Sequence, residues 1–213
     1  KDWRVREALI TAFNFEFINQ TNTGGRQNRI TSYYSNSVLS MKSGVAEGRV
    51  LDFLVPHAAD LLPGTLEGYT LPQSDGSARN RKNIRIADDL LNQAGWTVQD
   101  GLRRNAQGQA FEIVTVLKQG DTESQSMMDI YQQALERLGI TLSTEVLDSA
   151  QYKERTQVYD FDMAYYRRGL SLSPGNEQIL YWGADGVEKP GTRNWMGMNS
   201  PAAEDMINRL LSS

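Results

Sequence analysis

Residues 111–178 read FEIVTVLKQGDTESQSMMDIYQQALERLGITLSTEVLDSAQYKERTQVYDFDMAYYRRGLSLSPGNEQ, and this stretch decides the fold. Residues 111–117 are an apolar, β-branched run that ends in a polar turn, as is typical of a buried strand. Apolar residues then recur at helical spacing, and Gly139 supplies the left-handed residue at which a helix stops. Because Thr122 and Gln125 have capping-box spacing, we expect Thr122 to begin this helix.

Two further strands follow in the same stretch. Apolar and polar residues alternate over residues 140–147, which predicts a half-buried strand, and Asp148 is placed to cap a weaker helix over residues 149–158. The inner row of the third strand consists of Phe161, Met163 and Tyr165. Two successive strand-helix-strand units favour parallel pairing. We therefore predict an α/β fold, with helices on both faces of a mixed, mostly parallel sheet and residues 111–178 as its central module.

This geometry predicts where a ligand binds. In open α/β sheets, ligands bind beyond the carboxyl ends of the strands, and here the loops 119–121, 148–149 and 167–178 follow those ends. The last loop is rich in hydroxyl and amide groups, which donate and accept hydrogen bonds. Its candidate contacts are Ser171, Ser173, Asn176, Glu177 and Gln178. The alternative interpretation is an ordinary surface crossover, since loops are generally polar.

Composition limits the classes of function. The chain has 213 residues, a net charge of −4 and no cysteine. The charge gives no reason to expect a nucleic-acid partner, and the missing cysteines exclude disulfides and thiolate chemistry. No apolar run approaches the ~20 residues that span a bilayer. The chain starts at Lys1, inside an expected helix and without an initiator Met, so we expect a fragment or a processed chain.

Outside the central stretch, three helices are expected. Asp2 is placed to cap the first, which has one apolar face, and Asn83 to cap a second that closes at Gly95. Ser200 is placed to open the last helix. Residues 19–28 break all periodicity, so we expect an exposed loop there.

Two other groups of residues have side chains suited to ligands. Tyr33 and Tyr34 combine stacking surfaces with hydroxyl groups, although one tyrosine in the core and one facing water is the common arrangement. Arg193, Asn194 and Trp195 bring together a guanidinium, an amide and an indole. His57 is not accompanied in the sequence by residues that would form a catalytic or metal site with it, so we expect it to be structural.

No nucleophile, metal or phosphate-loop motif occurs in the sequence. Asp160 and Asp162 stand two apart on an expected strand and so share a face, as an acid pair would. Pairing with a lysine or arginine is the competing interpretation. We expect binding rather than catalysis, with no metal and no cofactor.

Several segments together resemble the extracellular solute-binding proteins of family 5, the receptors of peptide and nickel ABC importers. The segments shared with the whole family are DWRVREAL (2–9), LLNQAGW (90–96) and DFDM (160–163). Those that resemble the Yej-type oligopeptide-binding branch are FNFEF (13–17), YYSNSVL (33–39), DGS (75–77) and SLSPGNEQ (171–178). The similarity runs almost end to end.

The resemblance implies that residues 1–213 are a single lobe, the carboxy-terminal one, of a two-lobed type II periplasmic binding protein. It further implies an oligopeptide or modified peptide as solute, a missing second lobe, a membrane ABC permease as partner and a Gram-negative periplasm. One departure concerns the aspartate that pairs with the peptide amine in dipeptide and oligopeptide receptors. Here Leu170 or Ser171 stands at the matching position. Two alternatives stay open: a hydrolase using Asp160 or Asp162, and a protein-interaction module with an exposed Trp182 and Trp195.

Overall fold

The computed structural model describes residues 2–212, which divide into two compact units. Unit 1 comprises residues 1–29, 71–152 and 161–166, and unit 2 comprises residues 30–70, 153–160 and 167–213. Whether residues 1–213 form a single lobe stays a prediction. No described helix has both the length and the apolar character that a bilayer crossing needs.

Unit 1 is built on a three-stranded, fully parallel sheet in the order β4-β3-β5. The strands are β3 (Glu112–Lys118), β4 (Thr141–Leu147) and β5 (Met163–Ala164). The strand order along the chain and the parallel pairing confirm the predicted α/β arrangement. The third strand, β5, is shorter than expected. Val146, near the end of β4, is exposed, so the half-buried face predicted for β4 does not extend to this residue.

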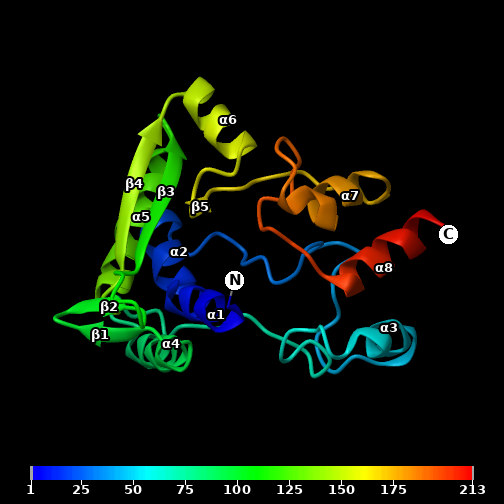
Figure 1. The fold of residues 1–213 in the computed structure, drawn as a ribbon, viewed down its shortest axis with the longest axis horizontal. Helices are drawn as coiled ribbons and strands as arrows, with labels where there is room; N and C mark the ends of the chain where they lie inside the picture. Colours follow the sequence, from blue (N-terminus) through cyan, green and yellow to red (C-terminus); the bar gives the residue numbers. More distant parts are fainter. Residues whose placement is uncertain (1, 213) are drawn as a thin grey trace. The chain divides into compact units, whose positions relative to one another are not determined.

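The helix between the first two strands is α5 (Thr122–Glu136), which runs alongside β3 and β4 in Figure 1. Thr122 is its first residue, as predicted, but the N-cap is Asp121 rather than Thr122: the Asp121 side chain accepts a hydrogen bond from the N–H of Ser124 at 3.0 Å. A carboxylate one residue earlier satisfies the free amide groups instead. Gly139 ends this segment with φ +74°, as predicted.

Three further helices and a hairpin complete unit 1: α1 (Trp3–Ala12), α2 (Phe15–Thr23), α4 (Arg81–Gln93), β1 (Thr97–Gln99) and β2 (Leu102–Arg104). Asp2 caps α1 as predicted. The expected loop at residues 19–28 is wrong in its first half, because α2 runs through it between an Asn14 cap and the left-handed Gly24. Asn83 lies buried inside α4, whose N-cap is Asn80.

The hydrophobic core described for the chain lies in unit 1 and joins α1, α4, α5 and the sheet. The hairpin is attached to it by Arg103, which is 0 % exposed. Its Nε donates to Leu138 O at 2.6 Å, and its other nitrogens bond Asn92, Trp96 O and Asp88. Every part of a buried cation is thus paired, as burial of a charge requires.

Unit 2 contains short helices and long connections. Its helical elements are α3 (Gly48–Leu54), η1 (Val55–His57), α7 (Glu177–Trp182), η2 (Ala184–Val187) and α8 (Pro201–Leu211), with α6 (Ser149–Gln157) entering from unit 1. Asp148 and Ser200 cap α6 and α8, as predicted. Only three of the described buried hydrophobic residues belong to this unit: Tyr181, Ala202 and Ile207.

Candidate functional site

Three of the predicted contacts in the polar loop after β5 are exposed to solvent. Ser171, Ser173 and Asn176 are exposed. The hydroxyl of Ser171 accepts a hydrogen bond from the N–H of Ser173 at 3.0 Å, and Asn176 precedes α7 without a side-chain capping bond. The loop therefore offers hydroxyl and amide groups, as the sequence predicted for a binding loop.

The same loop is held from within by Glu177 and Gln178. Oε1 of Glu177 accepts hydrogen bonds from the N–H of Gly175 and from Nε2 of Gln178, both at 3.0 Å. Gln178 is only 6 % exposed and also donates to the Tyr34 hydroxyl at 3.2 Å. The structure thus brings together three predicted residues from stretches 144 positions apart.

The charges of this network follow from its contacts. The hydrogen bond from Gly175, followed by that from Gln178, lowers the pKa of Glu177, so its carboxylate is stabilised in the ionised form. Burial raises the pKa of Tyr34, and the charge of Glu177 adds to this effect. A fixed carboxylate, an amide and a neutral phenol therefore support the loop from its inner side.

In the second predicted group, Arg193 to Trp195, the side-chain amide of Asn194 is used within the fold. Asn194 is 1 % exposed; its Nδ2 donates to Gly183 O at 3.0 Å and Met198 O at 2.8 Å, and its Oδ1 accepts from Met198 N at 2.8 Å. These bonds leave no amide group of Asn194 for a ligand. Arg193 is exposed and donates to the Tyr181 hydroxyl at 2.6 Å, while Trp195 is half-buried.

One residue of the same loop, Arg168, was not among the predicted contacts. The guanidinium of Arg168 stacks on three rings, which we call the aromatic cluster: its carbon lies 4.4, 3.3 and 5.5 Å from the ring centres of Tyr33, Tyr181 and Trp182. Burial lowers the pKa of Arg168. Tyr33 also contacts Trp182, with ring centres 4.6 Å apart. The sequence signal for Arg168 was the pair of arginines, Arg167 and Arg168, that follows the predicted strand. Nothing in the sequence identified the aromatic partners of Arg168.

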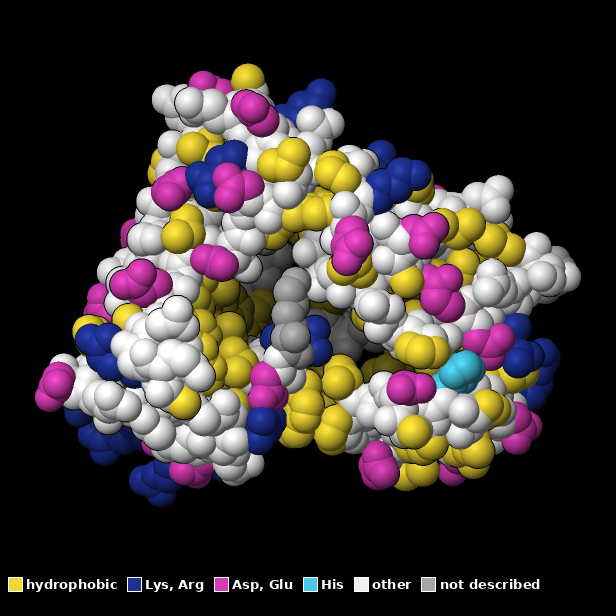
Figure 2. All heavy atoms as spheres, viewed as in Figure 1, with side chains coloured by type: hydrophobic (Ala, Val, Ile, Leu, Met, Phe, Trp, Pro, Cys, Tyr) yellow, Lys and Arg dark blue, Asp and Glu magenta, His cyan; other side chains and the backbone are white. Residues whose placement is uncertain are grey.

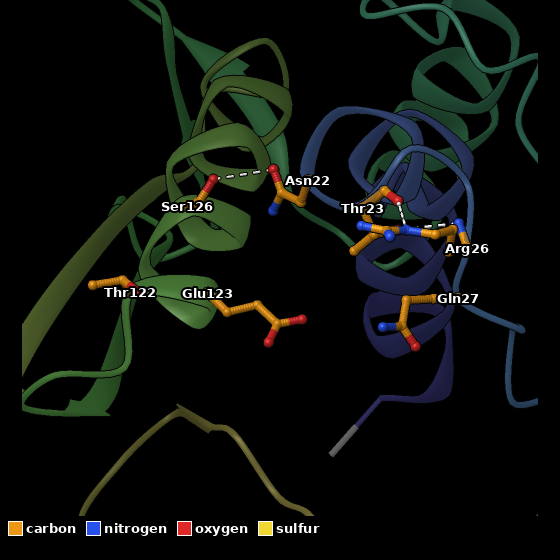
Figure 3. Close-up of a pocket in the computed structure, with 7 residues that line it drawn as sticks. All are labelled: Asn22, Thr23, Arg26, Gln27, Thr122, Glu123 and Ser126. Carbon is orange, nitrogen blue, oxygen red and sulfur yellow. Dashed lines mark hydrogen bonds between the residues drawn. The ribbon is translucent and has the colours of Figure 1, made fainter.

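Unit 1 has a shallow hollow of its own, of about 500 Å³, between the end of α2 and the start of α5 (Figure 3). It is lined by Asn22, Thr23, Arg26, Gln27, Thr122, Glu123 and Ser126. Ser126 donates to Asn22 across it at 3.1 Å, and Arg26 bonds to Thr23 on its own side. The lining residues are polar and exposed or half-buried, and the predicted contacts Ser171 and Ser173 do not line it.

The proposed acid pair does not form. Asp160 and Asp162 both precede β5 rather than lying on it. Asp160 pairs with Arg155 at 2.9 Å, and Asp162 accepts from the N–H of Val114 at 2.9 Å. Each carboxylate therefore has a separate structural partner, and for Asp160 this is the pairing with an arginine that was the competing interpretation. Trp182 and Trp195 are both half-buried, so the predicted exposed tryptophan patch is absent from the described residues.

His57 connects two segments of unit 2. Its Nε2 lies 3.0 Å from a carboxylate oxygen of Asp205, which also pairs with Arg209 at 3.0 Å. Figure 2 shows the single histidine at the surface among acidic and basic side chains. No group of three or more histidine, aspartate or glutamate side chains converges among residues 2–212 as metal ligands would.

Comparison with known proteins identifies the family. Residues 1–189 match the description of bacterial extracellular solute-binding proteins, family 5 middle. The Agrobacterium fabrum protein named "Peptidoglycan-binding protein YepA" is 34% identical over 218 residues, covering 100% of this chain and 34% of that protein. The "Probable peptide-binding protein YejA" of the same organism is 30% identical over 210 residues, covering 98% of this chain and 34% of that protein.

A solved structure shows the same fold. The oligopeptide-binding protein AppA from Bacillus subtilis, in complex with a nonapeptide, superimposes with a TM-score of 0.68 at 19% identity, covering 98% of this chain and 35% of that one. This likeness confirms the predicted fold of a type II periplasmic-binding-protein lobe. The chain spans about a third of the length of these relatives. It belongs to the bacterial extracellular solute-binding proteins of family 5, in the Yej-type branch.

Proposed function

We propose that this chain forms one side of the solute-binding site in a longer ABC-importer receptor. This receptor captures an oligopeptide or a modified peptide in the periplasm. The observation that supports this most directly is the loop of residues 167–176. Its Ser171, Ser173 and Asn176 side chains are exposed, while Glu177 and Gln178 hold it from within. A pre-organised polar loop suits an extended peptide, because binding does not have to order it.

The finer parts of this proposal follow from the family and its relatives. Family 5 proteins are solute-binding proteins, and the names of YejA and YepA point to peptides and peptidoglycan. The second lobe and a membrane permease are the partners such a receptor requires. Since the position of the usual amine-binding aspartate holds Leu170 or Ser171, a peptide with a modified amino terminus fits the loop.

The proposal is tested with the full-length protein. Solutes that co-purify with it should be identified by mass spectrometry and then titrated by calorimetry. The double variant Ser171→Ala and Ser173→Ala should weaken binding by about 5- to 50-fold, since each net hydrogen bond contributes about 1 kcal/mol. Ser43→Ala, an exposed serine outside this loop, is the matched control. Unchanged affinity in the double variant would remove this loop from the site.

A further inference from the structure

Three polar groups in the aromatic cluster are buried without a hydrogen-bond partner among the described residues. They are Nη1 and Nη2 of Arg168 and the hydroxyl of Tyr33. A buried guanidinium without an acceptor is unfavourable, because it has lost its hydration and gained no bond in return. Arg103 in unit 1 shows the usual arrangement, with every nitrogen bonded.

Stacking does not satisfy these groups. The guanidinium carbon of Arg168 lies over the rings of Tyr33 and Tyr181, 4.4 and 3.3 Å from their centres. The N–H bonds of a guanidinium point outward in its plane, where they form paired hydrogen bonds with carboxylates. The stack therefore holds Arg168 in place and leaves its hydrogen-bonding edge without an acceptor.

The local charge favours an anion at this edge. Glu177 is the nearby acid, but its Oε1 already accepts from Gly175 and Gln178, and no ion pair between Glu177 and Arg168 occurs in the described structure. Arg193 places a second guanidinium carbon 5.5 Å from the ring centre of Tyr181. Two guanidinium groups thus lie against the ring of Tyr181, and the charge of Glu177 acts on Arg168.

We propose that the edge of Arg168, assisted by the Tyr33 hydroxyl, binds a carboxylate of the captured solute. This inference rests on the proposed function and specifies its solute as a peptide with an accessible carboxyl group. Both nitrogens are enclosed, so the carboxylate reaches them only when a covering side chain moves. Trp182 belongs to the same cluster, and its fluorescence should change as the site fills.

The test uses the full-length protein and a pool of short peptides that lack Asp and Glu, prepared with free carboxyl termini and, separately, with amidated termini. The free-acid pool should bind about 10- to 100-fold more tightly, the range expected for charge-assisted hydrogen bonds. Arg168→Gln should abolish this preference, so that the free-acid and amidated pools bind it with equal affinity. Arg167→Gln, which changes the exposed neighbouring arginine, should keep the preference.

The outcomes separate the two proposals. If neither pool binds the wild-type protein, the peptide function fails, and this inference fails with it. If both pools bind equally, or if Arg168→Gln keeps the preference for the acid, the peptide function stands and the role of Arg168 is overturned.

If circular dichroism shows that Arg168→Gln does not fold, Arg168→Lys is the variant that tests the proposal. It should reduce the preference at least about fivefold, because an ammonium does not form two parallel bonds. A lysine variant with the full wild-type preference would overturn the proposal.

Discussion

At the scale of single residues, Asn194 shows how a side chain suited to ligands is used within the fold. Its three hydrogen bonds join Gly183 and Met198 across a loop that has no sheet to order it. Asn194→Ala should lower the free energy of unfolding by about 1–3 kcal/mol, because it leaves buried backbone groups unpaired. Urea denaturation measures this, with the exposed Asn199→Ala as the control. Equal stability of the two variants would contradict the structural role.

The contact between His57 and Asp205 makes a second residue-scale prediction. Hydrogen bonds from His57, and then from Arg209, lower the pKa of Asp205 below its ordinary value of 3.8. A lowered pKa means that the carboxylate stabilises the fold above pH 3.8 and loses this contribution as the pH falls through its folded-state pKa. In His57→Ala, the pKa of Asp205 should rise, as measured by NMR titration. A pKa that stays at its wild-type value would show that Arg209 alone is responsible.

At the scale of elements, the cap of α5 separates the prediction from the structure. Asp121→Ala removes the acceptor for the N–H of Ser124 and should destabilise the protein by about 0.5–2 kcal/mol. Thr122→Ala is the matched control, since Thr122 occupies the first helical position and is exposed. Thermal or urea unfolding of both variants measures the difference. A larger loss of stability in Thr122→Ala than in Asp121→Ala would show that Thr122 is the cap.

The elements that could be predicted are those whose signals are local. The apolar run of β3, the stop at Gly139 and the caps Asp2 and Asp148 each depend on a few adjacent residues. The start of α2 was missed, because Asn14 caps it inside a run of aromatic residues that reads as extended. The loop was selected from its composition, and its role in binding stays a prediction. Its aromatic support was not predicted, since Arg168 meets Tyr33 and Trp182 only through tertiary packing.

At the scale of the whole molecule, the two units differ in what they bury. The hydrophobic core cluster lies in unit 1, whereas unit 2 contributes Tyr181, Ala202 and Ile207 to the described buried hydrophobic residues. Backbone amides in α5 and β3 should therefore exchange with deuterium more slowly than those in α3 and α8 of the isolated chain. Hydrogen exchange with mass spectrometry measures this. Equal protection in both units would show that unit 2 has stability that its sparse core does not explain.

If the loop of residues 167–176 binds solute as proposed, its internal bracing has a consequence for how receptors of this family diversify. Glu177 and Gln178 fix the course of the loop, while the hydroxyls of Ser171 and Ser173 project outward and take little part in holding it. Substitutions at the two serines should therefore alter solute specificity without destabilising the loop. Descendants of one ancestral receptor could exchange one cargo for another by changing a few outward-facing positions.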